Sequence, residues 1–510
     1  MLYIRRMYVK IVGMKKKSRL KPEEREFFSL VSRAVFTNPF TDDRVALDLK
    51  ITGLPSHVTE GKRIEKLREV VAARVAQLEA KDRAEISRFA GHDLLLVETS
   101  FLFDFFHQFL EKFDQFIQEQ IDAGNTPLKV SFARDAFGYL KKRGFTNADM
   151  RRYFELVFQL RRAYFFIDRS LVGCSAGMKE LRRKLWNNVF THDLNLYNIH
   201  LWDRMEDFST LLLGETGTGK GTAAAAIGRS GFIPYDESKG CFVESFTRTF
   251  VSLNLSQFPE NLIESELFGH KKGAFTGAVE DYEGIFDRCS PHGSIFLDEI
   301  GEVSIPVQIK LLQVLQERDF SPVGSHDMHR FNGRVIAATN RPLRDLRRRG
   351  RMRDDFYYRL CSDILTVPPL RERIKQDPAE LDDLLTLLVE RMLGKSSPEV
   401  VDMVRDVIQH KLGKHYPWPG NVRELEQCVR AVLLNQHYEG EKQIQTPDLR
   451  TQLVEGIQNG TVEAQRLLAG YCYMLYRRHG TYEAVARRAN LDRRTVKKYV
   501  DEWKNVNAEG

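Results

Sequence analysis

The stretch LLLGETGTGKGTAAAAIG, residues 211–228, decides the fold of this chain. Its three leucines predict an apolar strand that runs directly into the pattern GETGTGK, and an alanine-rich helix follows. In that order, backbone N–H groups of a glycine loop can wrap phosphates, the helix N-terminus faces the anion, and the lysine reaches the outer phosphates. The sequence therefore predicts an α/β fold with a phosphate-binding loop, whose nucleotide contacts come from Gly214, Glu215, Thr216, Gly217, Thr218, Gly219, Lys220, Gly221 and Thr222.

Polar residues that follow two other apolar runs complete the predicted site. SIFLDEIGE ends in Asp298 and Glu299 at the expected carboxyl edge of a strand, where an α/β sheet binds its ligand. Asp298 would hold Mg²⁺, directly or through water, and Glu299 would polarise the attacking water as general base. RVIAATN ends in Asn340, which is suited to sensing a γ-phosphate. Because Gly221 stands where Ser or Thr usually serves the metal, coordination must depend on Thr222, water or Asp298.

The pattern of apolar and polar residues divides the chain into five regions. Apolar runs that alternate with helical patterns, namely STLLLGE, CFVESF, TFVSLNL, SIFLDEI and RVIAATN, predict a parallel sheet with helices on both faces. The expected regions are a helical N-terminal region of unknown type (1–168), an α/β core (169–378), a helical lid (379–438), a linker (439–462) and a small all-α unit (463–510).

Two helical stripes stand out in the N-terminal region. One runs through KLREVVAARVAQL, from Leu67 to Leu78, and the other runs through FDFFHQFLEKFDQFI, with Phe105, Phe109, Phe113 and Phe116 on one face. Both are interpreted as core. His107 has no partner at metal-ligand spacing, and the sequence assigns it no role.

Composition and charge limit the possible functions. The chain has 510 residues, of which 42% are hydrophobic and 29% charged, and no run approaches the ~20 apolar residues of a membrane span. Six cysteines lie far apart without a CxxC, which is typical of neither a zinc knuckle nor a disulfide framework. We therefore expect a cytoplasmic protein without a membrane partner. The segment 477–500 has eight Lys and Arg against two acids, which suggests a nucleic-acid partner, and the alternative, which is the commoner origin of basic runs, is a solvated helix face.

Three arginines are candidates to complete the nucleotide site. Arg353 and Arg359, in RMRDDFYYRL, could stabilise phosphoryl transfer in a neighbouring subunit, and the alternative is surface ion pairing with Asp354 and Asp355. Arg423 lies in the first turn of a predicted lid helix, from which it could reach a nucleotide between core and lid. For that helix the sequence predicts an N-cap at Asn421, to which Glu424 would reach back.

GHKKGAFTGAVED, residues 269–281, predicts a flexible loop. Two glycines within six residues disfavour helix and strand, and the small residues around Phe275 cannot build a core. We expect a mobile support with an exposed aromatic tip. The alternative is a turn whose Phe275 folds back into the core.

The C-terminal sequence GTYEAVARRANLDRRTVKKYVDEW, residues 480–503, fits a helix-turn-helix. Val496, Val500 and Trp503 form an apolar stripe on the second helix, the turn falls at Asn490, and Asp492 is a plausible cap. The outward residues are expected to meet bases and phosphates of double-stranded DNA in a major groove: Arg493, Arg494, Thr495, Lys497 and Lys498.

Taken together, residues 171–436 resemble the AAA+ domain of the sigma-54-dependent transcriptional activators, the bacterial enhancer-binding proteins. The matching motifs are GAFTGA (273–278), LVGCSAGM (171–178), GETGTGK, FLDEIGE, QIKLLQVLQE, AATNRPL, RDDFYYRL, VPPLRER and WPGNVRELE. The similar element at the C-terminus is a Fis-like helix-turn-helix.

The resemblance implies ATP and Mg²⁺ as cofactors and a ring, typically a hexamer. It implies that Asn254 restrains the catalytic Glu299, that Arg353 and Arg359 act in trans, and that Arg423 is the second sensor. It also implies that the loop grips sigma-54 through Gly273, Ala274, Phe275, Thr276, Gly277 and Ala278.

The predicted function is an ATP-dependent transcription activator that binds enhancer DNA and remodels sigma-54 RNA polymerase holoenzyme, in a bacterial cytoplasm and associated with the nucleoid. One alternative is a AAA+ DNA-binding repressor or scaffold that acts independently of sigma-54, and another is a chaperone or helicase-type motor. The chain departs from the family at Gly221, where Glu is usual, and in a longer segment at 231–249. Residues 1–168 do not resemble a phosphorylatable receiver domain.

Overall fold

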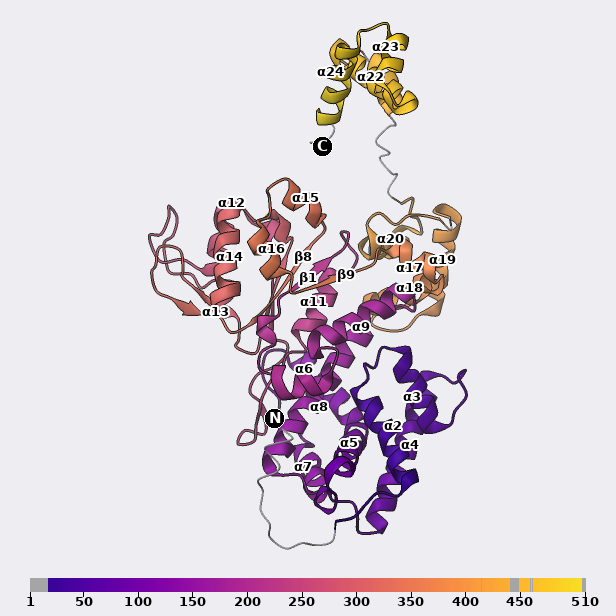
Figure 1. The fold of residues 1–510 in the computed structure, drawn as a ribbon, viewed down its shortest axis with the longest axis vertical. Coiled ribbons are helices and arrows are strands. Elements are labelled where there is room, and N and C mark those ends of the chain that lie inside the picture. Colours follow the sequence, from indigo (N-terminus) through magenta and orange to yellow (C-terminus); the bar gives the residue numbers. More distant parts are fainter. Residues whose placement is uncertain (1–16, 414, 441–448, 459, 461, 507–510) are drawn as a thin grey trace. The chain divides into compact units, whose positions relative to one another are not determined.

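The computed structural model describes residues 17–413, 415–440, 449–458, 460 and 462–506 (Figure 1). The chain packs into two compact units, Met1–Tyr438 and Glu439–Gly510. None of the helices in the described part of the chain combines the length and the apolar composition that a membrane span requires.

A five-stranded parallel sheet organises the first unit. Its strand order is β4-β5-β8-β1-β9, with β1 at Thr210–Leu213, β4 at Phe250–Asn254, β5 at Ser294–Asp298, β8 at Arg334–Thr339 and β9 at Asp363–Thr366. In the register, Asn254 lies opposite Asp298 and Leu213 lies opposite Thr339. Because all strands run the same way, the chain segments that follow them meet at one edge of the sheet.

The sheet confirms four of the five predicted strands and corrects the fifth. CFVESF contributes only β3 (Cys241–Phe242), which pairs antiparallel with β2 (Tyr235–Asp236) outside the parallel sheet. The fifth strand of the sheet is β9, which the sequence did not predict because its four residues include a single buried side chain, Leu365. A second short ribbon pairs β6 (Asp319–Phe320) with β7 (His329–Arg330).

Helices surround the sheet, and a separate helical group forms the lid. Those of the core are α9 (Ala176–Phe190), α10 (Leu194–Leu196), η3 (Tyr197–Leu201), η4 (Met205–Asp207), α11 (Lys220–Gly228), η5 (Leu255–Gln257), α12 (Glu260–Phe268), α13 (Ile285–Arg288), η6 (Ile300–Glu302), α14 (Ile305–Glu317), α15 (Leu343–Arg348) and α16 (Asp354–Leu360). The lid has its own hydrophobic core, to which Leu370 and Trp418 belong, and consists of α17 (Leu370–Gln376), α18 (Ala379–Leu393), α19 (Pro398–Lys411) and α20 (Asn421–Asn435).

The N-terminal region is helical, as predicted. It consists of α2 (Pro22–Phe36), α3 (Asp42–Thr52), α4 (Glu60–Ala80), η2 (Ile86–Arg88), α5 (Gly91–Gln108), α6 (Leu110–Ala123), α7 (Ala133–Lys142) and α8 (Asn147–Ser170). Leu67 and Leu78 are buried on the predicted face of α4. The phenylalanine stripe is also buried but does not lie on one helix: α5 ends and α6 begins at Phe109, whose ring packs against Phe132.

The N-terminal helices and the sheet-containing core share one hydrophobic cluster. Phe154 and Phe158, on α8, stack on Phe242 of the β2–β3 ribbon, with ring centroids 5.9 Å and 4.1 Å apart. Phe166, near the end of α8, packs edge-on against Phe246. Since α8 also packs on α11, no break in packing separates the two regions near residue 168. The segment 231–249, which is longer than is usual in the family, is therefore the part of the core on which the N-terminal helices pack.

The second unit contains α21 (Leu449–Gln458), α22 (Ala464–His479), α23 (Tyr482–Ala489) and α24 (Arg493–Val506). The predicted linker 439–462 thus contains a helix, whose Leu453 packs with Ala469 and Trp503, and 441–448 lie outside the described residues. The turn between α23 and α24 falls at Asn490, with a left-handed φ of 53°, as the sequence predicts. Asp492 accepts hydrogen bonds from the backbone N–H groups of Arg494 and Thr495 and so caps α24.

Candidate active site

The phosphate loop joins β1 to α11. Gly217 and Gly219 have φ angles of 79° and 102°, left-handed values that favour glycine. The Lys220 Nζ donates hydrogen bonds to the carbonyl oxygens of Gly214 at 2.9 Å and Glu215 at 3.2 Å. Burial lowers the pKa of Lys220, and Glu299 and Asp298 oppose that shift. The ammonium is thus held against the loop that would wrap a phosphate.

The acid pair lies beside this loop. Glu299 follows β5 with a left-handed φ of 57°, a conformation that is uncommon outside glycine and is concentrated at functional sites. The Asn340 backbone N–H donates to Glu299 Oε2 at 3.4 Å, and Asn340 Nδ2 donates to Thr216 Oγ1 at 2.9 Å. Burial raises the pKa of Glu299, whereas Lys220 lowers it. Groups predicted from three separate motifs therefore meet at one edge of the sheet.

Oxygen ligands for a divalent cation come from two elements. Asp298 ends β5, and Thr222 is exposed in the first turn of α11. A Cβ on Gly221 would meet the Phe296 ring at 3.8 Å, so this position has room for a side chain but supplies no oxygen. Mg²⁺ prefers oxygen ligands and usually keeps several waters. Asp298 and Thr222, completed by water, fit that preference.

Asn254 lies at the end of β4, beside the acid pair. Its Oδ1 accepts hydrogen bonds from the backbone N–H of Ser256 at 3.0 Å and from the Ser256 hydroxyl at 2.7 Å. In the described part of the chain, no direct hydrogen bond joins Asn254 to Glu299. Its role as a restraint on Glu299 therefore stays a prediction.

Arg353 and Arg359 both lie at α16. Arg353 forms a bidentate ion pair with Asp355, with N–O distances of 3.0 and 2.7 Å, so the surface ion pair weighed from the sequence is present. The Arg359 Nε donates to the Leu315 carbonyl on α14 at 2.7 Å. These partners lie on α14 and α16 rather than on the phosphate loop, which leaves the action of both arginines in trans a prediction.

The start of α20 contacts the phosphate loop directly. The Val422 N–H donates to the Gly217 carbonyl at 3.0 Å, and a Cβ on Gly217 would collide with the Gly420 carbonyl oxygen at 2.2 Å. The same Cβ would lie 3.0 Å from the Cβ of Arg423, which places this predicted sensor beside the loop. Arg371, on α17, adds a bidentate ion pair to Glu215.

The predicted cap of α20 is wrong in one respect. Asn421 does not cap the helix: it is buried, with a left-handed φ of 54°, and its Oδ1 accepts from the Leu370 N–H at 2.8 Å. Its Nδ2 donates to the Thr216 carbonyl at 3.0 Å, so the side chain ties the lid to the phosphate loop. Glu424 does reach back, and accepts from the Gly420 N–H at 2.9 Å.

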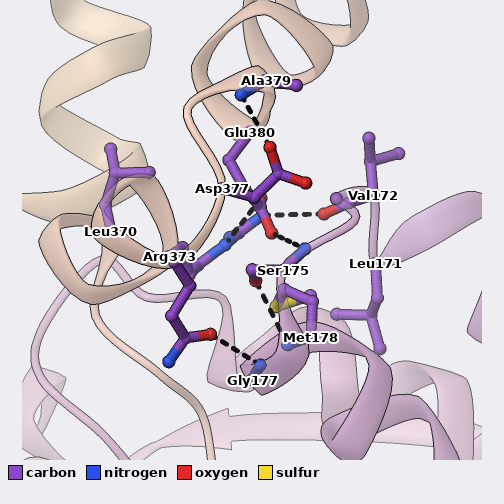
Figure 2. A network of polar contacts seen from close by, with 12 residues as sticks. Leu171, Val172, Ser175, Gly177, Met178, Leu370, Arg373, Asp377, Ala379 and Glu380 are labelled. Carbon is purple, nitrogen blue, oxygen red and sulfur yellow. Dashed lines mark hydrogen bonds and ion pairs between the residues drawn. The ribbon is translucent and has the colours of Figure 1, made fainter.

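A buried polar network joins α9 to the lid (Figure 2). Arg373 and Glu380 form an ion pair whose side chains are 3% and 0% exposed. Glu380 also accepts from the Ser175 N–H at 2.8 Å, and Arg373 donates to the Val172 carbonyl at 2.7 Å. A Cβ on Gly173 would overlap the Glu380 carboxylate at 2.1 Å, which explains why the first of the two glycines in LVGCSAGM is a glycine. Sequence reasoning missed this network, because its partners lie about 200 residues apart.

The GAFTGA segment forms a looped projection between α12 and α13. The Gly273 N–H donates to the Ala278 carbonyl at 2.9 Å, and the Ala278 N–H donates to the Phe275 carbonyl at 3.0 Å. Gly273 and Gly277 have φ angles of 80° and 105°, while a Cβ on either would meet nothing within 4 Å. Glycine is therefore favoured at both positions because of the left-handed backbone conformation, since a larger side chain would meet no neighbouring atoms.

The exposed side chains of this loop differ from the prediction. Phe275 is half-buried, because its ring packs edge-on against the His270 imidazole with centroids 4.9 Å apart. Thr276 is exposed, and Val279, just beyond the motif, is 77% exposed. The loop thus exposes Thr276 and Val279, while the Phe275 ring is partly covered by His270.

The predicted DNA-contacting residues lie on α24 of the second unit. Arg493, Arg494, Lys497 and Lys498 are exposed. Two of them form ion pairs: Arg493 with Glu483 at 2.8 Å, and Lys498 with Glu502 at 3.8 Å. The Thr495 hydroxyl bonds Asp492 and so belongs to the cap.

The fold and the site together define a class of protein. A parallel sheet with a phosphate loop after β1, an acid pair after β5, a polar residue after β8 and a helical lid against the loop are the parts of a AAA+ ATPase. Consistent with this class, residues 197–365 match the family described as Sigma-54 interaction domain, and residues 380–466 match the AAA+ ATPase lid domain.

Named bacterial regulatory proteins match slightly less than half of the chain. The Nif-specific regulatory protein of Azotobacter vinelandii is 43% identical over 229 residues, which are 45% of this chain and 40% of that protein. The hydrogenase transcriptional regulatory protein HoxA of Cupriavidus necator is 42% identical over 230 residues, 45% of this chain and 44% of that protein. The chain thus spans less than half the length of these curated relatives.

Among solved structures, NtrX from Brucella abortus in complex with ADP is 18% identical and covers 73% of this chain and 80% of that one, with a TM-score of 0.40. That likeness is too loose to support a conclusion. The family matches, by contrast, confirm the resemblance of the central part of this chain to the sigma-54-dependent activators.

Proposed function

We propose that this protein is an ATP-dependent transcription activator that remodels sigma-54 RNA polymerase holoenzyme. The observation that carries the proposal is an intact GAFTGA loop in the same unit as a complete phosphate site, within a segment that matches the sigma-54 interaction domain. No observation favours the repressor, scaffold, chaperone or helicase alternatives. The proposed setting is the bacterial cytoplasm, at the nucleoid.

In the proposed reaction, Lys220 and the loop N–H groups bind the outer phosphates of ATP, and Glu299 accepts a proton from the attacking water. Asp298 and Thr222 would hold Mg²⁺, which supplies charge neutralisation on the phosphates. Asn340 contacts both Thr216 and Glu299, so it is positioned to register whether a γ-phosphate is present. Arg353 and Arg359 would serve the site of the next subunit in a ring, typically a hexamer.

Chain connectivity offers a route from the nucleotide to the loop. β4 ends at Asn254, and the chain then forms η5, α12, the loop and α13 before it re-enters the sheet as β5, which ends at Asp298. The first arm of the loop therefore starts at Asn254, opposite Asp298 and beside Glu299, whereas the second arm enters β5 at Ser294, at the other edge of the sheet, and reaches Glu299 through the strand itself. A shift at the end of β4 or along β5 changes the base of the loop, which gives hydrolysis a mechanical output.

Enhancer binding is proposed for α24. Its exposed Arg494 and Lys497 point to major-groove and phosphate contacts on double-stranded DNA. The proposed Fis-like unit would bind as a dimer and so collect copies of the chain for ring assembly.

Replacing Thr276 by alanine tests the role of the loop. We expect Thr276→Ala to keep ATP hydrolysis and to lose binding to purified sigma-54 in the presence of ADP and a metal fluoride, because Thr276 is exposed and makes no part of the phosphate site. Pull-down of sigma-54 and a phosphate-release assay measure the two properties.

Thr59→Ala is the matched control, since Thr59 is an exposed threonine whose side chain makes no cap hydrogen bond. Equal loss of hydrolysis and sigma-54 binding in Thr276→Ala, or unchanged binding, would contradict the proposed role of the loop.

A further inference from the structure

A large cavity lies within the N-terminal helices, away from the phosphate loop. Its volume is about 1380 Å³, and its wall consists of residues from α2–α5, α8 and α9 and from the segment that leads toward β1. Ligand sites commonly measure roughly 300–1,000 Å³, so a molecule of several rings fits. Ala90 and Leu95 line the cavity and are exposed, which provides an opening to solvent.

Seven Phe, Tyr and Trp side chains line the wall together with aliphatic ones, and they include Phe36, Phe89, Phe103, Phe106, Tyr164 and Trp186. Aromatic faces and edges pack favourably on other flat rings, with a contribution of roughly 0.5–1.5 kcal/mol per pair. The composition of the wall thus favours an aromatic occupant over a flexible polar one.

The cationic and acidic side chains of the wall balance one another in number, and several are held in ion pairs. Four cationic and four acidic side chains line the cavity. Asp48 pairs with Arg44 at 2.8 Å and with Arg63 at 3.7 Å. Glu98 accepts a hydrogen bond from the Tyr153 hydroxyl at 2.9 Å. An ionic ligand would have to break such pairs or bring a charge without a counterpart, so the cavity suits an uncharged molecule.

One buried polar group of the wall keeps hydrogen-bonding capacity. His107 is 6% exposed, and its Nδ1 lies 2.9 Å from the Phe103 carbonyl oxygen, so Nδ1 carries the proton and donates it. Burial lowers the pKa of His107 to about 3, which keeps the ring neutral and leaves Nε2 as an acceptor. Among the described residues, no hydrogen-bond partner is found for Nε2.

We propose that this cavity is a sensory site for a small, uncharged aromatic molecule, with His107 Nε2 accepting a hydrogen bond from an O–H or N–H group of the ligand. The ligand would contact α5 through His107 and Phe103, and α9 through Trp186.

Helix α9 connects this site to the ATPase. Near its C-terminal end, Trp186 lines the cavity, and Asn38 from the α2–α3 loop donates to the Arg183 carbonyl at 2.9 Å. Its middle packs on α11, the helix of the phosphate loop. At its N-terminal end, Ser175 bonds Glu380 of the lid network (Figure 2). A 15-residue helix about 22 Å long thus contacts the cavity, the phosphate loop helix and the lid.

We infer that occupancy of the cavity biases the position of α9 and so the fit of the lid on the phosphate loop. This coupling rests on the proposed ATPase function, whereas ligand binding does not. By linkage, nucleotide must change the affinity for the ligand by the factor with which the ligand changes the affinity for nucleotide.

The binding test uses the full chain and N-phenyl-1-naphthylamine, a neutral aromatic probe with one N–H donor. We expect saturable binding with energy transfer from tryptophan to the probe. Trp186→Phe should remove most of this transfer, because Trp186 lines the cavity. Absence of saturable binding by the full chain overturns the proposal.

Variants of the wall test the site itself. Leu102→Phe with Leu160→Phe fills the cavity and should abolish probe binding, whereas Leu128→Phe, a partly buried leucine of the same region that does not line the cavity, should not. His107→Phe should weaken binding about two- to tenfold, but leave binding of the N-methylated probe unchanged. Equal losses for both probes would remove Nε2 from the site.

The remaining measurements distinguish two questions, namely which molecule or segment fills the cavity and whether its binding affects the ATPase. If the probe binds only after residues 1–16 are removed, those residues occupy the cavity and the ligand proposal fails. ATP, compared with ADP, should change probe affinity in the full chain, and the probe should change the ATPase rate. Binding without either effect would overturn the coupling through α9 alone, and binding in a chain that hydrolyses no ATP would overturn the proposed function and keep the sensory site.

Discussion

At the scale of single residues, the chemistry of this protein is concentrated where strands end. Lys220, Glu299 and Asn340 come from three motifs, each with an apolar run directly before or after it, so their convergence could be predicted from the sequence. Glu299 combines a left-handed backbone with a pKa raised by burial, which suits a general base more than a surface carboxylate.

Glu299→Gln is expected to bind ATP and to lose hydrolysis, because the amide keeps the shape and the contact with Asn340 but cannot accept a proton. Filter binding of labelled ATP and phosphate release measure the two properties. Glu302→Gln is the matched control, since Glu302 lies in the same turn and pairs with Arg341 at 2.5 Å. Unchanged turnover in Glu299→Gln would remove this residue from the mechanism.

Residues whose roles depend on distant partners could not be predicted in this way. The sequence predicts Asn421 as a helix cap, but its side chain ties the lid to the phosphate loop, and Glu380, which belongs to none of the motifs, is fully buried against Arg373. Each side chain also bonds a partner outside the lid, Thr216 for Asn421 and Ser175 for Glu380, which it meets only after the lid has docked. Local sequence pattern therefore identified the candidate catalytic groups, which meet at one edge of the sheet, and missed the residues that join the lid to the phosphate loop and to α9.

At the scale of elements, short strands caused the main errors in the prediction. CFVESF has the apolar alternation of a sheet strand, yet it forms a ribbon against the N-terminal helices, while β9 completes the sheet with one buried side chain. The alternation of apolar and polar residues indicates that a segment is half-buried, but it does not indicate which part of the protein covers the apolar side. The turn between α23 and α24 and the cap of α24 were predicted more closely, because Asn490 and Asp492 are local signals.

The exposed cations of α24 allow a prediction about DNA binding by this helix. Arg494→Ala is expected to weaken binding to a specific site by ~1–3 kcal/mol if Arg494 contacts a base, and to relax the preference at one position. Lys497→Ala, an exposed cation on the same helix, is the comparison, with a similar loss on all sequences and a smaller salt dependence if it contacts phosphate. Fluorescence anisotropy with specific and scrambled duplexes measures both. No loss in either variant would contradict α24 as the DNA-contacting helix.

At the scale of the whole molecule, the division into regions follows the packing and not the motifs. The motif-rich part begins near Leu171, but the hydrophobic cluster runs from Leu20 to Val367 without a break near residue 168. A sequence boundary marks a change of pattern, whereas a structural boundary needs a gap in buried contacts. The second unit, by contrast, has clusters of its own around Val485 and Trp503.

Two truncations test this organisation. A chain that begins at residue 169 is expected to be insoluble, because it exposes Phe242 and Phe246, which are 3% and 1% exposed in the full chain. A chain that ends at residue 438 is expected to remain soluble and to hydrolyse ATP, with DNA binding lost. Size-exclusion chromatography and phosphate release measure both. A monodisperse, active chain that begins at 169 would contradict the shared core.

The β2–β3 ribbon, on which the N-terminal helices pack, has a further consequence for the design of hybrid proteins. A hybrid that exchanges only the first 168 residues for those of a related protein would press foreign side chains onto Phe242 and Phe246. The N-terminal helices and the ATPase core of this chain are therefore not interchangeable parts, and residues 231–249 have to be exchanged together with the helices that pack on them.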